Sequence, residues 1–339
     1  MGMTEPELQR LLLGIPLPAM LVRRDDHVVA VNAAGTVLLG EGIVGRHPAM
    51  AVRAPAVLEA ISTVAREGGV QEARMALRRE GQEAVFQATV SDQGDALLCV
   101  FRDVTEAERA GELRRDFVAN VSHELRTPLT ALMGFIETLK NAAKDDPKAR
   151  AMFLAIMETE AGRMNRLVRD LLQLSRVEAE ERVRPRDPVA LIPLLEGVIG
   201  TLKGVAEQKG DRVELSGAPA TVPGDADQLT QVFTNLIENA LKYGGAGQVV
   251  RISLSPEETV RGPAVRVEVA DQGEGIDPVH LPRLTERFYR VDSHRSREMG
   301  GTGLGLAIVK HIVSRHRGWL RVESAMGEGS RFSVVLPLG

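Results

Sequence analysis

The pattern of hydrophobic and polar residues changes character twice along the chain. In the first hundred residues, apolar residues come in short runs broken by glycine and charged turns, which is typical of strands. One stretch instead has apolar residues at helical spacing and ends at two glycines, Gly68 and Gly69. The expected order is strands at 19–22 and 27–31, an irregular region at 32–48, a helix at 55–66, and strands at 72–78, 84–90 and 96–104.

From about residue 106, apolar residues recur every three or four positions, which predicts a long amphipathic helix to about residue 139. Its length is on the order of 50 Å. A polar turn at 141–146 follows, and Pro147 suits the first turn of a second helix that reaches about residue 181. Each helix has one wide apolar stripe, and two helices alone cannot bury both stripes. We therefore expect a dimeric, antiparallel four-helix bundle.

A charged, proline-containing linker at 182–187 ends the helical region. After it, helical and strand patterns alternate, which predicts an α/β sandwich. The expected elements are helices at 191–208, 227–242 and 304–315, and strands at 212–215, 248–254, 264–271, 319–323 and 330–336.

Composition narrows the function classes. A chain of 339 residues with 44% hydrophobic and 26% charged residues is typical of a globular protein with two or three domains. The net charge of −4 argues against nucleic acid as a partner. The single cysteine, Cys99, excludes an intrachain disulfide and fits a cytoplasmic compartment. The most membrane-like run, at 11–22, is far shorter than the roughly 20 residues of a spanning helix, so we expect no transmembrane segment.

A histidine within the long helix is the first candidate for chemistry. His123 falls off the apolar stripe and should face solvent, and its imidazole is a good nucleophile near neutral pH. Glu124 follows it, and Thr127, four residues on, shares its face and can orient a water molecule. Pro128 has no N–H for the carbonyl of Glu124, so the helix should bend after this site. Taken alone, such a histidine is more often an ordinary surface residue.

The last domain has a polar helix face and two glycine-rich stretches. Asn235, Asn239 and Lys242 share one helical face, where amide oxygens can ligate Mg²⁺ and a lysine can meet a phosphate. Asp271 ends a strand, and its carboxylate can accept a hydrogen bond from an exocyclic amine. The stretch 300–306 leads into a helix, whose free N–H groups bind anions. Each piece by itself also fits an ordinary polar helix face or glycine turn.

The basic segment 288–297 resembles a lid over a triphosphate. Together, the four pieces resemble the N, G1, F and G2 boxes of the sensor histidine kinase ATP-binding domain, in the superfamily shared with gyrase and Hsp90. The stretch 327–330 resembles the closing glycine motif of that family, and 123–128 matches its H-box. The resemblance covers about residues 105–339.

The resemblance implies roles for individual residues. It implies that His123 is phosphorylated, that Glu124 is its hydrogen-bond partner or base, and that Thr127 assists dephosphorylation of a partner. It implies that Asp271 reads the adenine amine and Asn239 holds Mg²⁺. The nucleotide-binding set that it implies is Asn235, Asn239, Lys242, Tyr243, Asp271, Gly273, Gly275, Ile276, Arg290, Gly301, Thr302, Gly303, Leu304 and Gly305.

One difference within that superfamily favours phosphoryl transfer over hydrolysis. Its ATP hydrolases carry a water-activating glutamate one helical turn before the Mg²⁺ asparagine. Here that position is Asn235, which cannot act as a base. A gyrase- or Hsp90-like ATPase therefore remains an alternative but a weaker one. A scaffold that binds ATP and a regulator without transferring phosphate is a second alternative.

The first hundred residues have the strand and helix order of a PAS sensor domain, and Asp103-Val104-Thr105 resembles the exit of such domains into a signalling helix. A small α+β domain of another role is the alternative. Around the H-box, 117–130 and 134–138 look most like phosphate-regulon sensor kinases. Those proteins usually carry membrane segments, which leaves peripheral association with a membrane sensor complex open.

The sequence thus predicts a multidomain α+β protein in three parts. They are a PAS-like α/β sensor at 12–104, a dimerisation and histidine phosphotransfer hairpin at 105–182, and an α/β-sandwich ATP-binding domain at 188–339. The expected function is that of a homodimeric sensor histidine kinase. It would use ATP and Mg²⁺, phosphorylate His123, and pass the phosphoryl group to the aspartate of a response regulator.

Overall fold

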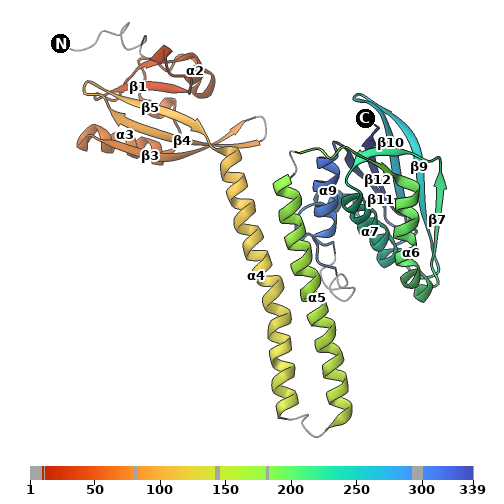
Figure 1. Ribbon diagram of the computed structural model, residues 1–339. Coiled ribbons are helices and arrows are strands. Elements are labelled where there is room, and N and C mark those ends of the chain that lie inside the picture. Colours follow the sequence, from red (N-terminus) through yellow and green to blue (C-terminus); the bar gives the residue numbers. More distant parts are fainter. Residues whose placement is uncertain are drawn as a thin grey trace. The chain divides into compact units, whose positions relative to one another are not determined.

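A computed structural model describes residues 10, 12–79, 82–141, 146–180, 183–291 and 301–338. The chain divides into two compact units, Met1–Ala119 and Asn120–Gly339. The long helix α4, Thr105–Lys140, begins in the first unit and ends in the second (Figure 1). Two five-stranded sheets and a long helical hairpin confirm the predicted multidomain α+β class.

The first unit is an antiparallel sheet with helices against it. The strand order is β2-β1-β5-β4-β3, and every neighbouring pair is antiparallel. All five predicted strands and the predicted helix are present. The elements are β1 (Ala19–Arg23), β2 (Val28–Val31), α2 (Ala33–Leu39), η1 (Pro48–Met50), α3 (Pro55–Glu67), β3 (Val70–Arg79), β4 (Gln82–Asp92) and β5 (Ala96–Asp103).

The core of this unit lies between α3 and the sheet. Val57, Ile61 and Val64 are buried at helical spacing and pack with Met75 and Phe101. The prediction of an irregular region at 32–48 was wrong in part, because it contains α2, and η1 begins at its last residue. Asn32 caps α2: its Oδ1 accepts the N–H of Gly35 at 2.8 Å. This cap stabilises a helix too short to show an apolar period.

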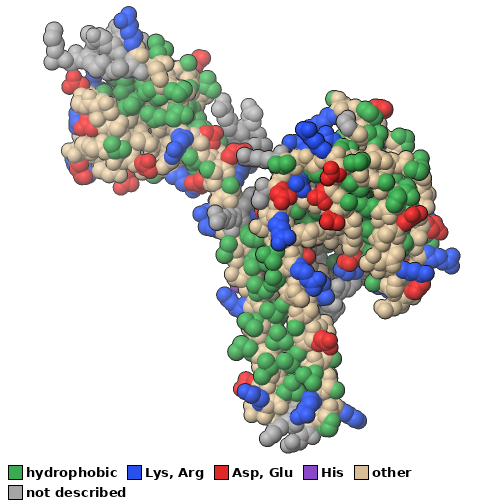
Figure 2. Space-filling view, viewed as in Figure 1, with side chains coloured by type: hydrophobic (Ala, Val, Ile, Leu, Met, Phe, Trp, Pro, Cys, Tyr) green, Lys and Arg blue, Asp and Glu red, His purple; other side chains and the backbone are tan. Residues whose placement is uncertain are grey.

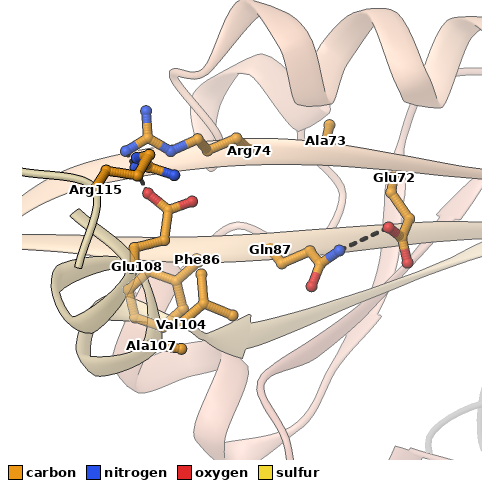
Figure 3. A pocket seen from close by; sticks show the side chains of 10 residues that line it. Glu72, Ala73, Arg74, Phe86, Gln87, Val104, Ala107, Glu108 and Arg115 are labelled. Atoms are coloured by element: carbon orange, nitrogen blue, oxygen red, sulfur yellow. Dashed lines mark hydrogen bonds and ion pairs between the residues drawn. The ribbon is translucent and has the colours of Figure 1, made fainter. Parts of the chain in front are cut away.

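A cavity of about 530 Å³ lies outside that core, between the sheet and the start of α4. Figure 3 shows its lining, with Phe86 and Val104 beside the charged residues Arg74 and Glu108. Arg74 Nη2 and Glu108 Oε2 are 2.7 Å apart, so this ion pair joins β3 to α4.

In the second unit, α4 and α5 (Pro147–Glu180) form the predicted helical hairpin (Figure 1). The rings of Phe135 and Phe153 lie 5.4 Å apart between the two helices. α4 continues through Pro128, which is buried, and the predicted bend there stays a prediction. No helix in the described part of the chain has the length and apolarity needed to cross a membrane.

Many large apolar side chains of the hairpin are exposed. Figure 2 shows hydrophobic side chains gathered along it. On α5, Leu172 is 59% exposed, although the same helix buries Leu167 and Leu174. The other large apolar side chains that α4 and α5 expose are Val118, Leu129, Met133, Ile136, Met152, Leu154, Ile156 and Val168.

The rest of the second unit is the predicted α/β sandwich. Its sheet has the order β11-β12-β10-β9-β7, antiparallel except for the parallel pair β7 and β9. Helices α6, α7 and α9 pack on it. Sequence reasoning missed the short pair β6-β8 and the 3-10 helix η2. The elements are β6 (Asp187–Ala190), α6 (Leu191–Lys209), β7 (Arg212–Gly217), β8 (Thr221–Gly224), α7 (Ala226–Tyr243), β9 (Val249–Thr259), β10 (Gly262–Ala270), η2 (Pro278–Arg283), α9 (Gly305–Arg315), β11 (Trp319–Ala325) and β12 (Gly329–Pro337).

Candidate active site

His123 lies on α4 with an exposed side chain, as its position off the apolar stripe predicts. Thr127, one turn further, is also exposed, and its Oγ1 donates to the carbonyl of His123 at 3.2 Å. Its hydroxyl is therefore held beside the histidine by their own helix. An exposed imidazole in this position is accessible to a nucleotide or to another protein.

Glu124 is engaged by two arginines. Its Oε2 accepts a hydrogen bond from Arg163 on α5 at 3.0 Å and another from Arg290 at 3.1 Å. The Arg290 side chain is only 7% exposed, so this ion pair is largely shielded from water. Within the described residues, no hydrogen bond joins Glu124 to the imidazole of His123, and its expected role toward that ring stays a prediction.

Helix α7 carries the polar face that was expected near a nucleotide. Asp225 caps it by accepting the N–H of Gln228 at 3.1 Å, and its opposite face is buried. Asn235, Asn239 and Lys242 are half-buried. Asn235 Nδ2 donates to the carbonyl of Gly305 at 3.3 Å, which ties α7 to the start of α9.

Asp271 follows the end of β10, and its surroundings favour a hydrogen-bond donor as ligand. Its Oδ1 accepts the N–H of Gly273 at 2.9 Å and that of Ser330 at 3.2 Å. Burial raises the pKa of the Asp271 carboxyl, and these two hydrogen bonds act in the opposite direction. Both bonds end on one oxygen, so the other oxygen can accept from a ligand amine.

The glycines of the first glycine-rich loop, which follows Asp271, bring backbone segments into close contact. A side chain at Gly273 would collide with the carbonyl of Tyr243, and one at Gly275 with the carbonyl of Ala325. Gly275 also has φ +74°, a conformation that favours glycine. The next residue, Ile276, donates its N–H to Ser324 Oγ at 2.8 Å.

The second glycine-rich loop, 301–305, leads into α9. Gly303 has φ +73° and packs against the backbone of Phe288, while Leu304 is fully buried and anchors the loop. Thr302 Oγ1 accepts the N–H of Leu304 at 3.3 Å and donates to Asp170 Oδ2 on α5 at 2.7 Å. Residues 292–297 of the predicted lid lie outside the described residues.

ATP with Mg²⁺ fits these residues. The carboxylate of Asp271 suits the adenine amine, and the glycines of the two loops let the surrounding backbone segments pack closely around the site. Lys242 supplies a cation, although its Nζ lies 3.3 Å from Glu238 Oε2. Among the described residues, no group of three or more acidic, histidine or cysteine side chains is arranged to hold a metal ion. The amide oxygen of Asn239 is of a type that hard cations such as Mg²⁺ accept as a ligand.

Sequence reasoning missed three residues that complete this arrangement. Asp170 and Arg163 lie on α5, where they read as ordinary charges of an amphipathic helix. Ser330 was noted only as part of a glycine motif, yet its N–H holds Asp271. The contacts of Asp170 with Thr302 and of Glu124 with Arg290 join residues 132 and 166 positions apart, which no local pattern could reveal.

Two family models match the chain. Residues 113–180 match the His Kinase A (phospho-acceptor) domain, and residues 224–339 match the histidine kinase-, DNA gyrase B- and HSP90-like ATPase family. The matched segments hold His123 and both glycine-rich loops. An ATP-binding domain of this family thus follows a phosphoacceptor helical domain in one chain.

Similar proteins agree with these matches. The phosphate regulon sensor protein PhoR of Pseudomonas aeruginosa is 43% identical over 249 residues, covering 73% of this chain and 55% of the relative. The sensor histidine kinase WalK of Bacillus subtilis is 38% identical over 244 residues, covering 72% and 40%. The chain thus spans about half the length of these curated relatives or less.

Solved structures support the fold. The histidine kinase AdeS of Acinetobacter baumannii has a TM-score of 0.50 at 27% identity, covering 64% of this chain and 98% of that one. The histidine kinase ThkA, solved in complex with the response regulator protein TrrA, has a TM-score of 0.54 at 21% identity, covering 97% and 98%. With both family models and these relatives in agreement, the chain belongs to the sensor histidine kinases of two-component systems.

Proposed function

We propose that this protein binds ATP with Mg²⁺, phosphorylates itself on His123, and passes the phosphoryl group to the aspartate of a response regulator. One observation carries the proposal: an exposed imidazole shares a compact unit with a nucleotide site that has an amide, Asn235, where a hydrolase would place its base. The amide of Asn235 also donates to the carbonyl of Gly305, and this hydrogen bond holds α7 against α9.

The proposed chemistry is an in-line displacement. A ring nitrogen of His123 attacks the γ-phosphorus of ATP, the bond from that phosphorus to the β,γ-bridging oxygen breaks, and ADP leaves with the electron pair. The second ring nitrogen then loses its proton. Glu124 is the proposed acceptor once it leaves Arg163 and Arg290. Catalysis is mainly positioning and charge neutralisation.

Each nucleotide residue has a proposed task. Asp271 binds the adenine amine, Asn239 holds Mg²⁺, which neutralises charge on the phosphates, and Lys242 and Arg290 contact the nucleotide. Tyr243 flanks it. The remaining members surround the nucleotide: Asn235, Gly273, Gly275, Ile276, Gly301, Thr302, Gly303, Leu304 and Gly305. Thr127 orients water for dephosphorylation of the regulator, for which its position one turn from His123 is suited.

We also propose that the protein is a homodimer through α4 and α5. The exposed apolar side chains of the hairpin support this, since they would be covered by a second copy in a four-helix bundle. The assignment of 12–104 as a PAS-like sensor, 105–182 as the phosphotransfer hairpin and 188–339 as the catalytic domain belongs to the same proposal.

The signal and the partner are proposed from the relatives. The 43% identity to the phosphate regulon sensor protein PhoR supports a role in phosphate-limitation signalling. The likeness of the fold to ThkA, which was solved with a response regulator protein, supports a receiver domain as phosphoryl acceptor.

The test is incorporation of label from γ-labelled ATP. His123→Ala should abolish incorporation while nucleotide binding persists, because the substitution removes only the nucleophile. His27→Ala, at an exposed histidine of the first unit, is the matched control and should label normally. Label that persists in His123→Ala would refute the assignment of the acceptor.

A further inference from the structure

Two carboxylates of the helical hairpin hold two residues of the proposed phosphate site. Asp170 Oδ2 on α5 accepts from the hydroxyl of Thr302 at 2.7 Å, and Glu124 Oε2 on α4 accepts from Arg290 at 3.1 Å. In nucleotide sites, phosphates are bound by groups such as a hydroxyl at a glycine-rich loop and a guanidinium. Here both are bound to protein anions instead.

The contact around Thr302 is closely packed. A cavity of about 10 Å³ is lined by Glu124, Pro128, Arg163, Met164, Leu167 and Thr302. That volume is at the lower limit for one water molecule. The hydroxyl of Thr302 has one hydrogen to donate, and Asp170 accepts it. A phosphate oxygen that takes this hydrogen bond must therefore displace the carboxylate of Asp170.

The charges around Asp170 come from both sides of this contact. Burial raises the pKa of the Asp170 carboxyl, and the hydrogen bond from Thr302 opposes that shift. The negative charge of Glu238 raises this pKa as well, while Lys242 and Arg166 lower it. Glu238 and Lys242 lie on α7, so Asp170 acts electrostatically on the helix that carries the expected Mg²⁺ residue.

We propose that Asp170 is a specificity-determining residue that competes with the terminal phosphate of ATP for the 301–305 loop. The inference rests on the proposed function of that loop. When the loop is bound to Asp170, the carboxylate of Asp170 repels the terminal phosphate of ATP. ADP lacks that phosphate, so the repulsion is weaker. ATP therefore binds only with loss of the Asp170–Thr302 contact, and ADP binding is compatible with that contact.

The linkage is reciprocal. If the contact between Asp170 and Thr302 weakens ATP binding, then ATP weakens that contact by the same factor. ATP binding thus removes one of the contacts that hold the catalytic domain on α5, and conversion to ADP favours its return. The pairs Arg287–Glu178 and Gln231–Gln173 also join the domain to α5. Asp170 in this way couples the state of the nucleotide to the strength of the contact between the domain and the hairpin.

The test compares the affinities of ATP and ADP by isothermal titration calorimetry. Asp170→Asn keeps the shape but removes the charge, so the ratio of ATP to ADP affinity should rise by about fivefold or more, the lower end of typical coupling energies. Asp170→Glu keeps the charge and should leave the ratio near that of the unaltered protein. Glu158→Gln, which removes an exposed charge from the same helix, is the matched control.

A purely structural role for Asp170 would change both affinities together and leave their ratio unaltered, which would overturn the inference. Retained ADP binding in Asp170→Asn shows that the site is folded. If the unaltered protein binds both nucleotides but Asp170→Asn and Glu158→Gln have equal ratios, the competition fails while the proposed function stands. Failure of the unaltered protein to bind either nucleotide would remove the proposed function and this inference with it.

Discussion

The two five-stranded sheets of the molecule differ in what they bury. Around the first, β2-β1-β5-β4-β3, the described buried residues are apolar except Asn32. The domain around the second, β11-β12-β10-β9-β7, buries Asp211, Gln248, Arg315 and His316 among its polar residues. Burying a polar group costs free energy unless the group is hydrogen-bonded. When its hydrogen bonds are satisfied, a buried polar group holds the neighbouring segments in one geometry, which a binding site requires. The difference indicates that the second sheet is the frame of a site with fixed polar geometry.

Gln248 illustrates how the second domain uses such groups. Its Nε2 donates to the carbonyl of Ala240 on α7 at 2.8 Å, and its Oε1 accepts the N–H of Gln272 at 3.0 Å. One buried amide thus joins the end of α7 to the loop after Asp271. The helix with the proposed Mg²⁺ residue and the loop with the proposed adenine residue are held in one geometry.

The largest expected effect is a loss of stability in the unit around the first sheet, without a change in ATP affinity. Phe101 is fully buried in the first core, so Phe101→Ala should destabilise that unit by about 3–5 kcal/mol. Thermal unfolding followed by calorimetry measures this, and ATP affinity should stay unchanged. Val37→Ala, at a side chain that is 67% exposed, is the control and should change stability little. A comparable loss of ATP affinity in Phe101→Ala would contradict the separation of the two regions.

The next largest effect is a loss of nucleotide affinity without a loss of stability. Asn239→Ala should leave the fold stable but lower Mg²⁺-dependent ATP affinity by about tenfold or more, equivalent to about 1.4 kcal/mol. The reason is that the amide oxygen is the proposed protein ligand of the cation. Titration of ATP with and without Mg²⁺ measures it, with the exposed amide of Gln208→Ala as control. Equal Mg²⁺ dependence in both variants would exclude Asn239 as a ligand.

The smallest expected effect concerns pH. Burial raises the pKa of Asp271, and the ionised carboxylate is the stronger acceptor for an adenine amine. ATP affinity should therefore weaken as pH falls from neutral toward that raised pKa. Asp271→Asn has no ionisable group, so it should bind ATP more weakly near neutral pH and lose this part of the pH dependence. Parallel pH profiles for the two proteins would show that Asp271 does not contact the nucleotide.

Local pattern sufficed for much of the fold. Both long helices, the strands of both sheets and α7 have apolar residues at a clear period, and the structure has them close to their expected bounds. The elements that were missed are short: α2 has seven residues, and β6 and β8 have four each. Segments of that length are stabilised by a cap or by pairing with a distant strand, and neither gives a period.

The site divides in the same way. The motif positions around His123, Asn239 and Asp271 could be named from their resemblance to the boxes of a known family, because those boxes are short local stretches. The contacts of Glu124 and Asp170 could not, because they join α4 and α5 to residues beyond 280. The resemblance implied Glu124 as the partner of the imidazole, which stays a prediction, and the structure adds its contacts with Arg163 and Arg290. Long-range ion pairs depend on how domains pack, which no local spacing encodes.

The central claim is that the second domain delivers the γ-phosphoryl group of ATP to His123 rather than to water. A single-turnover experiment tests it most directly, with the purified protein in excess over γ-labelled ATP·Mg²⁺ and the label followed in protein and in free phosphate. Our account predicts that label appears first on the peptide containing His123, in an acid-labile form, and that little free phosphate is released meanwhile. Release of free phosphate without labelled His123 would contradict it.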